Sequence, residues 1–367
     1  MISLLLDSSE LKITQFLGKP NSKFRLVADP ELISKIYYAR RNKGEEVKLD
    51  SIIPLDNDTL NAINEAASRS GDCGIYLVAD ATGEANRVAQ LRATYPNITF
   101  YGFMEDFLPT FLARKSHEIT NLETLDLQAS LDVVLLFAPP RSGSSLVADV
   151  LTDLGVGNTA EHLRPNIIEC MKASYRCNWS KIVRRFLHLS AVDGWAGSKL
   201  ISHFLTDYFD GSFRHALIAE LSRDGHRLHP IFLYRNNVVL QAVSGYLASK
   251  RGVWHMVKGQ ARDVYEEDRN ISYNFDSMFS RYANYKRQIA NMQFLEEMFP
   301  DNLTLVYEED CSNVMELAVK LGEYLNLPTP TKLRRAERRK KLTNALNTEF
   351  ETRFKQEYRD LFARDVQ

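Results

Sequence analysis

The stretch that decides the fold is Leu131-Asp132-Val133-Val134-Leu135-Leu136-Phe137-Ala138-Pro139-Pro140-Arg141-Ser142-Gly143-Ser144-Ser145. Residues 131–138 form a nearly continuous apolar run rich in β-branched side chains, which is typical of a strand buried on both faces. Beyond the loop, apolar residues recur at helical spacing up to Gly155, at Leu146, Val147, Val150, Leu151 and Leu154. The stretch therefore predicts a strand, a phosphate-binding loop and a helix.

The loop at residues 140–145 has the features of an anion site. Backbone N–H groups point out of a helix start, where the helix dipole also favours negative charge, and Gly143 lets the backbone approach a ligand closely. A nucleoside-triphosphate kinase would need a lysine directly after the glycine, whereas here Arg141 precedes it. An arginine suits a bidentate grip on a sulfated phosphate without a metal. On these residues alone, an ordinary Ser/Gly helix cap is the alternative.

The second half of the chain alternates between strands and helices. Strands are expected at 131–138, 230–234 and 303–307, with helices from Ser144 and up to Lys250. Strands separated by helices imply a mainly parallel sheet that helices flank on both faces.

The first part of the chain predicts a smaller α/β domain over residues 1–127, followed by a larger domain over 128–367. Residues 74–103 read as strand, helix and strand, and helical character is also present upstream at 30–43 and 59–70. The turn at 80–84 lacks the three spaced glycines of a dinucleotide site, so a scaffold or partner-binding role is favoured.

Composition narrows the class of protein. The 46 basic and 47 acidic residues among 367 give a net charge of -1, which suggests no nucleic-acid partner. The longest apolar run is too short to span a bilayer, and the N-terminus lacks the features of a signal peptide, so a cytoplasmic protein is expected. The cysteines lack the paired spacing of a metal site, and no metal is predicted; they are Cys73, Cys170, Cys177 and Cys311.

A second cluster of polar residues follows the strand at 230–234. Arg235 comes directly after that strand, and Ser244 lies inside the next helix. Because the carboxyl ends of neighbouring strands in an open α/β sheet border one crevice, Arg235 and Arg141 can face the same ligand from two sides. A ligand with two separated phosphates requires such an arrangement.

With these pieces in order, the chain resembles a sulfotransferase that uses 3′-phosphoadenosine 5′-phosphosulfate (PAPS), and is most similar to the bacterial trehalose 2-sulfotransferase family, which modifies glycolipids. The resemblance runs from about residue 131 to the C-terminus. It rests on the segments 140–146, 160–162, 197–200, Arg235 with 241–244, 252–254 and 306–309. The chain departs from the family at Asn236 and Asn237, where acidic residues are usual, which affects the expected contacts with the acceptor.

The resemblance implies a role for each matching residue. The donor's 5′ phosphosulfate would be held by Arg141, Ser142, Gly143, Ser144 and Ser145. Its 3′ phosphate would be held by Arg235 and Ser244. Glu161 matches the family's general base, and His162 is its rival because an imidazole titrates near neutral pH. Lys199 matches a lysine that would help the leaving phosphate.

The resemblance also implies partners: a carbohydrate or glycolipid acceptor and, by analogy with related enzymes, a homodimer. Related enzymes close the donor site with C-terminal residues, so the basic run at 332–341 offers Arg334 or Arg335 for a nucleotide contact or for peripheral contact with an anionic membrane surface. A solvated helix face is the simpler interpretation of that run. Trp254 would shape the acceptor pocket or pack in the core.

The sequence thus predicts an α/β protein with a P-loop-type, mainly parallel sheet, preceded by a smaller α/β domain. The predicted reaction moves the sulfuryl group of PAPS to a hydroxyl of a carbohydrate or glycolipid. Two alternatives stay open. One is a catalytically weak, nucleotide-binding regulatory protein, and the other is a P-loop kinase, which lacks the expected lysine.

Overall fold

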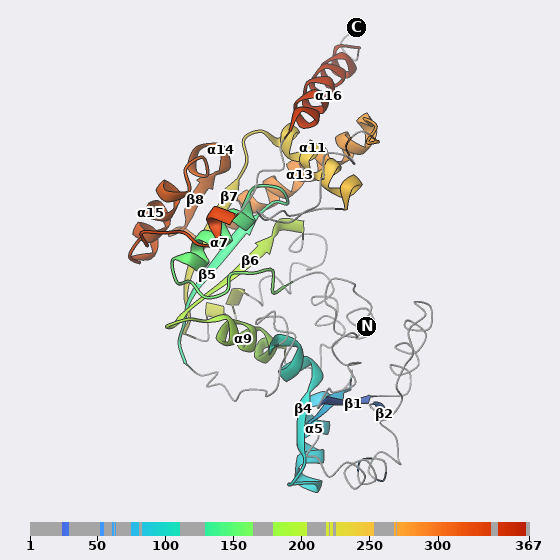
Figure 1. Cartoon of the computed structure of the whole chain (residues 1–367), viewed down its shortest axis with the longest axis vertical. Helices are drawn as coiled ribbons and strands as arrows, with labels where there is room; N and C mark the ends of the chain where they lie inside the picture. The colour runs from blue at the N-terminus through green and yellow to red at the C-terminus, as the bar shows by residue number, and fades with distance from the viewer. Residues whose placement is uncertain are drawn as a thin grey trace. The chain divides into compact units, whose positions relative to one another are not determined.

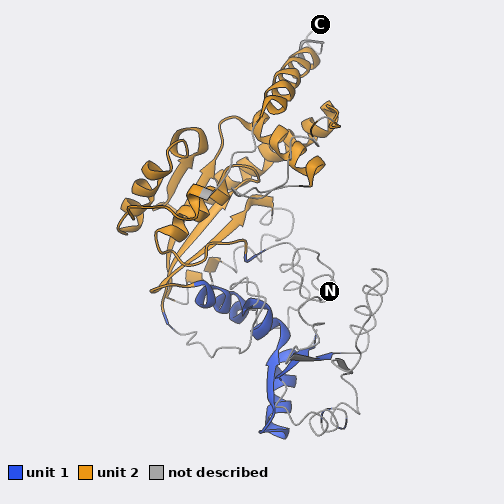
Figure 2. Ribbon diagram, viewed as in Figure 1, with its two compact units in different colours: residues 1–129, 162–190 blue, residues 130–161, 191–367 orange. Residues whose placement is uncertain are grey.

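The structure is a computed structural model, and it describes residues 24–28, 52–54, 61, 63, 75–80, 83–110, 129–163, 179–203, 218–219, 221–222, 225–252, 268, 270–338 and 344–364. The chain divides into two compact units (Figure 2). Unit 1 comprises residues 1–129 and 162–190, and unit 2 comprises residues 130–161 and 191–367. Residues 162–190, which we had expected in the larger domain, thus group with the N-terminal part.

Unit 2 contains a parallel sheet of four strands in the order β6-β5-β7-β8 (Figure 1). The strands are β5 (Asp132–Ala138), β6 (Trp195–Ile201), β7 (Arg227–Tyr234) and β8 (Leu303–Val306). All three pairings are parallel. The predicted fold class, a mainly parallel α/β sheet flanked by helices, is confirmed. The strand β6 was not expected from the sequence.

Helices cover both faces of this sheet. On one face, alternate residues of β5, β7 and β8 pack against α7 (Ser144–Asp153) and α15 (Val314–Leu325), with Val134, Leu136 and Leu305 fully buried. On the other face, Phe137 stacks on Phe232 with ring centroids 4.8 Å apart. Phe299, which follows α13 (Phe275–Glu296), packs 6.0 Å from Phe137. Burial on both faces explains why β5 reads as a continuous apolar run.

A second layer of helices completes unit 2. The helix α11 (Val238–Arg251) packs on α13 and on α16 (Ala345–Arg364). Aromatic rings fill the space between these helices, and Phe275 stacks on Phe354 at 5.2 Å. Short helices α14 (Tyr307–Asp310) and η4 (Ala336–Arg338) lie beside β8 and α7. This layer positions α11, which carries Ser244, against the sheet's carboxyl edge.

Unit 1 has a parallel sheet of its own, in the order β2-β1-β3-β4. Its strands are β1 (Phe24–Ala28), β2 (Ile52–Pro54), β3 (Ile75–Ala79) and β4 (Thr99–Gly102), and α5 (Glu84–Thr94) connects the last two. The predicted smaller α/β region is therefore present. Of its two predicted upstream helices, residues 30–43 lie outside the described residues, and within 59–70 only residues 61 and 63 are described, both helical.

Two charge pairs join α9 (Trp179–Ser190) to the helical turn η2 (Phe103–Phe107) within unit 1. Lys181 Nζ lies 2.7 Å from Glu105 Oε2, and Arg185 lies 3.6 Å from Asp106 Oδ1. The side chains of Glu105 and Arg185 are almost completely buried. Because burying a charge is costly unless it is paired, these contacts specify where α9 packs.

Glu84 is a buried carboxyl group at the start of α5. Its Oε1 accepts hydrogen bonds from the backbone N–H groups of Met104 and Glu105, at 2.9 and 3.0 Å. Burial raises the pKa of Glu84 well above its usual value, despite those two hydrogen bonds, and the nearby carboxylates of Glu105 and Asp106 raise it further. Glu84 thus binds the first turn of η2 through these two hydrogen bonds. Because it is buried, its carboxyl group stays protonated to a higher pH than usual.

No helix formed by the described residues is long and apolar enough to cross a membrane.

We predict that Glu84→Gln stabilises the protein at neutral pH. The folded state binds the Glu84 proton more tightly than the unfolded state, so its stability falls as pH rises above about 4.5, by up to about 1.4 kcal/mol per pH unit. Glutamine keeps an oxygen acceptor but has no proton to lose. Thermal unfolding should therefore show a higher Tm for Glu84→Gln at pH 7.5, with the difference shrinking toward pH 4.5. A constant difference at all pH values would contradict the assignment.

Candidate active site

The loop between β5 and α7 turns through two residues in the left-handed region. Arg141 has φ 64° and Gly143 has φ 94°. A Cβ on Gly143 would overlap the ring of Tyr307, which comes directly after β8. Glycine is therefore required at 143 for its backbone angle and for the close approach of an aromatic ring. Consecutive turn residues at a helix start present backbone N–H groups together, as in an anion-binding nest.

Side chains from β7 and α11 hold the backbone of this loop. Arg235 NH1 donates to the carbonyl of Arg141 at 3.0 Å, and Gln241 Nε2 donates to the carbonyl of Pro140 at 2.6 Å. The hydroxyl of Ser142 donates to the carbonyl of Pro139 at 2.8 Å. These bonds support a non-glycine residue in the left-handed region at 141, which costs about 1–2 kcal/mol. The bond to Pro139 directs the Ser142 hydroxyl inward, so a ligand in the loop would meet the backbone of Ser142 rather than its side chain.

Arg141 and Ser244, predicted from distant parts of the chain, lie in contact. Arg141 Nε donates to the hydroxyl of Ser244 at 3.1 Å. Burial lowers the pKa of Arg141, and so do the positive charges of Arg235 and Arg251. Arg235 and Arg251 also pair with carboxylates, those of Glu308 and Asp268, so part of the positive charge near this loop is balanced.

Lys199 joins the candidate base to the loop. Its Nζ lies 2.7 Å from Glu161 Oε1 and donates to the hydroxyl of Ser145 at 3.2 Å. The Lys199 side chain is 7% exposed and that of Glu161 is 22% exposed. The structure therefore brings together Glu161, Lys199 and Ser145 at the start of α7, where Ser144 is also buried.

Local backbone pairing places Glu161 beside Lys199. Ala160 forms a parallel bridge with Ser198 of β6, and Lys199 N donates to the carbonyl of Ala160 at 2.9 Å. A Cβ on Gly197 would overlap Thr159, whose hydroxyl donates to Val156 O at 3.2 Å. The absence of a side chain at 197 lets the segment before Glu161 lie against β6.

Glu308 fixes the position of Arg235. Its carboxylate accepts hydrogen bonds from Asn236 N at 2.9 Å, from Asn237 N at 3.2 Å and from Arg235 Nε at 3.3 Å. Partial burial raises the pKa of Glu308, but these backbone hydrogen bonds and the charge of Arg235 lower it overall. Arg235 also stacks over Tyr307, with its guanidinium 5.1 Å from the ring centroid.

Asn236 and Asn237 have structural partners in the described residues. Asn237 caps α11 by accepting from Leu240 N at 2.9 Å, and its Nδ2 donates to Glu351 at 2.8 Å. Asn236 Nδ2 donates to Glu309 at 3.1 Å. Glu308 and Glu309 thus supply acidic groups beside Arg235 and Asn236.

His162, the residue after Glu161, packs within unit 1. It belongs to unit 1, whereas Glu161 belongs to unit 2. The His162 ring is buried and stacks on Phe186 of α9, with centroids 5.9 Å apart. Packing against an aromatic ring suits a structural histidine.

The C-terminal basic run is only partly described. Arg335 N donates to Asp153 Oδ2 at 2.8 Å, at the last residue of α7. That end of α7 is about 15 Å from the loop at its start, given the rise of a helix. Trp254 and residues 339–341 lie outside the described residues.

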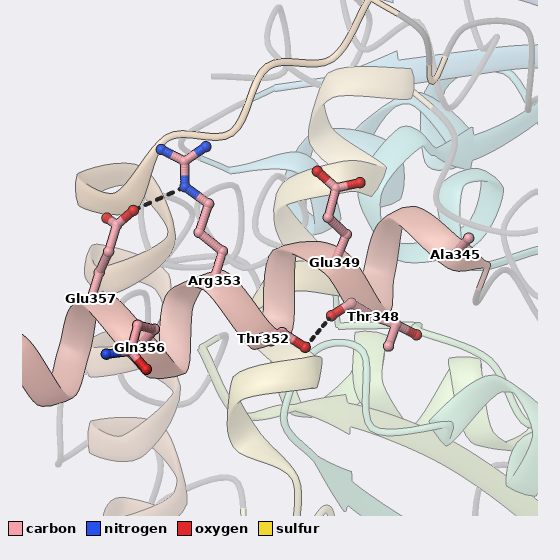
Figure 3. A pocket seen from close by; sticks show the side chains of 7 residues that line it. All are labelled: Ala345, Thr348, Glu349, Thr352, Arg353, Gln356 and Glu357. Atoms are coloured by element: carbon pink, nitrogen blue, oxygen red, sulfur yellow. Dashed lines mark hydrogen bonds and ion pairs between the residues drawn. The ribbon is translucent and has the colours of Figure 1, made fainter.

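A surface hollow follows one face of α16 from Ala345 to Glu357 (Figure 3). Its described lining comes from that helix alone, and none of the predicted site residues is part of it. Arg353 in this lining pairs with Glu357 at 2.9 Å and lies over the ring of Tyr273 at 4.0 Å. The candidate active site therefore lies at the loop rather than at this hollow.

Comparison with known families supplies an independent test. Residues 210–357 match the family model of the Stf0 sulphotransferase. This part of the chain belongs to the Stf0 sulphotransferase family. The predicted resemblance to the trehalose 2-sulfotransferase family is confirmed there, and membership supports a sulfotransferase activity. No curated protein matches the chain.

The match to the Stf0 family covers one half of the candidate site. It includes Arg235 and Ser244, and it begins after the loop at 140–145, Glu161 and Lys199. The structure connects the two halves through the Arg141–Ser244 and Arg235–Arg141 hydrogen bonds. Among the described residues, no three histidine, cysteine, aspartate or glutamate side chains gather as a metal site.

Sequence reasoning did not assign Tyr307 or Gln241 to the site. Tyr307 had a usable signal, because it follows a strand of the parallel sheet as Arg141 and Arg235 do, and the carboxyl ends of such strands border one crevice. Gln241 lies inside a helix, where only tertiary packing shows which way a side chain points.

We predict that Gly143→Ala costs more stability than Gly155→Ala. Both glycines have φ 94°, but a Cβ on Gly155 meets nothing within 4 Å, whereas one on Gly143 overlaps Tyr307. Both variants should lose about 1–2 kcal/mol through the left-handed backbone, and Gly143→Ala about 1–3 kcal/mol more through overpacking. Chemical denaturation measures the difference. Equal losses in the two variants would show that Tyr307 does not restrict residue 143.

Proposed function

We propose that the protein transfers the sulfuryl group of PAPS to a hydroxyl of a carbohydrate or glycolipid acceptor. The observation that carries this proposal is the cluster of Arg141, Ser244 and Arg235 at the loop before α7, in a chain whose residues 210–357 belong to the Stf0 sulphotransferase family. A helix start, two arginines and several hydroxyls suit a donor with two separated phosphate groups.

The donor set of this loop fits a sulfated nucleotide. Arg141, Ser144 and Ser145 border the start of α7, where backbone N–H groups would hold the 5′ phosphosulfate. Arg235 and Ser244 lie on the side toward α11 and would hold the 3′ phosphate. The Arg141–Ser244 hydrogen bond of 3.1 Å means that the two proposed subsites adjoin each other.

Glu161 is the proposed general base. As the acceptor oxygen forms a bond to sulfur and the bond from sulfur to the bridging oxygen breaks, the acceptor proton must go to a base. Glu161 would take that proton, and Lys199 would place positive charge near the leaving oxygen, since it also bonds Ser145 at the loop.

The structure favours Glu161 over His162 because Lys199 contacts Glu161. The buried His162 ring instead packs on Phe186. A homodimer, by analogy with related enzymes, also stays part of this proposal, as does peripheral contact of the basic run at 332–341 with a membrane surface.

The kinase alternative has less support. The position after Gly143 is Ser144, and the ammonium group near the loop comes from Lys199 on the neighbouring strand β6. A regulatory protein that binds the nucleotide without turnover has the same donor site, so only a transfer assay separates it from an enzyme.

Adenosine 3′,5′-bisphosphate should bind this protein without a metal, and Arg141→Ala should weaken that binding by at least tenfold. The reason is the loss of charge-assisted hydrogen bonds to phosphate, each stronger than a neutral one. Calorimetric titration measures both affinities, with ATP and magnesium as the competing ligand. Tight binding of ATP and magnesium with none of the bisphosphate would overturn the donor assignment.

Glu161→Gln should bind adenosine 3′,5′-bisphosphate as the parent protein does, yet lose about 100-fold or more in sulfuryl transfer. Glutamine keeps the size of the side chain and cannot accept a proton. The measurement is transfer of labelled sulfate from PAPS to trehalose or a glycolipid acceptor, beside a binding titration. Turnover equal to that of the parent protein would exclude Glu161 as the base. The same two measurements would then be made on His162→Gln.

A further inference from the structure

The phenol of Tyr285 lies against the turn of α11 that carries Ser244. Tyr285 belongs to α13 and is 5% exposed. A Cβ on Gly245, the residue after Ser244, would overlap the Tyr285 hydroxyl. The glycine at 245 is therefore what allows the hydroxyl of Tyr285 to reach the backbone of α11 at this level.

The same turn of α11 also contacts Arg141, since Ser244, the residue before Gly245, accepts a hydrogen bond from Arg141 Nε at 3.1 Å. Burial is the main reason why the pKa of Tyr285 is raised, and the positive charges of Arg281 and Arg141 oppose that rise. In turn, Tyr285 is among the groups that affect the pKa of Arg141. A phenol hydroxyl can both accept and donate a hydrogen bond, so Tyr285 has a proton to offer to a bound anion.

A phosphate monoester needs such a donor. It carries close to two negative charges at neutral pH and three strongly accepting oxygens. A further cation at this point would be repelled by the charges of Arg141 and Arg235, which already lie in contact. A neutral hydroxyl adds a hydrogen bond without that repulsion, and burial keeps Tyr285 protonated.

We propose that Tyr285 is a specificity-determining residue of the donor site, where its hydroxyl donates to the 3′ phosphate beside Arg141 and Ser244. This inference rests on the proposed use of PAPS. Its role is to distinguish a nucleotide that carries a 3′ phosphate from one that does not. Gly245 makes that role possible by leaving room for the hydroxyl.

The test compares two nucleotides that differ only in the 3′ phosphate. The full chain is titrated by calorimetry with adenosine 3′,5′-bisphosphate and with adenosine 5′-monophosphate. Tyr285→Phe removes the hydroxyl and keeps the ring. We expect it to lose about tenfold or more in affinity for the bisphosphate and less than twofold for the monophosphate.

Two further variants make the test selective. Tyr282→Phe is the matched control, since Tyr282 lies on the same helix but packs on Phe354 and Tyr358, and it should bind both nucleotides as the parent protein does. Gly245→Ala keeps the phenol but blocks its approach, so it should show the same selective loss as Tyr285→Phe.

Three results would overturn this inference. They are parent-like binding of the bisphosphate by Tyr285→Phe, parent-like binding by Gly245→Ala, and an equal loss for both nucleotides, which would make Tyr285 merely structural. A parent protein that binds the bisphosphate no more tightly than the monophosphate would instead overturn the proposed donor.

Discussion

The parallel pairing of β5, β7 and β8 is the constraint on which the candidate site depends. Because the three strands point the same way, Arg141, Arg235 and Tyr307, each just beyond the end of its strand, lie at one edge of the sheet. Tyr307 then occupies the space where a side chain on Gly143 would lie, so the loop must run close beneath an aromatic ring. The path of the loop is set by packing as much as by its own sequence.

Charge divides the site into two halves. On the side toward α11, Arg141 bonds the hydroxyl of Ser244, and Arg235 bonds the carbonyl of Arg141 and the carboxylate of Glu308. Two guanidinium groups on this side favour a bound anion. Toward β6, Lys199 pairs with Glu161 and bonds Ser145. The start of α7 thus adjoins a half that carries two guanidinium groups and a half that carries Glu161, the proposed general base.

The connection between the units begins next to the candidate base. Glu161 is the last residue of unit 2 before the chain enters unit 1, and the chain returns to unit 2 after Ser190. Within unit 1 that inserted segment is held through Lys181 and Arg185, which pair with Glu105 and Asp106. These two pairs attach α9, the described end of that segment, to η2.

The sequence by itself determined the buried strand at 131–138, the anion loop and the alternation that gives a parallel sheet, because these depend on local apolar patterns and on residue types that only a few backbone conformations accept. It did not reveal β6, since Gly197, Ser198 and Lys199 interrupt the apolar pattern. Only the tertiary structure decided that Arg141 contacts Ser244, that Lys199 contacts Glu161 and that Tyr285 reaches α11. Each of these contacts joins residues far apart in the chain, and the direction of a side chain there is set by the packing of one element on another, which no local pattern records.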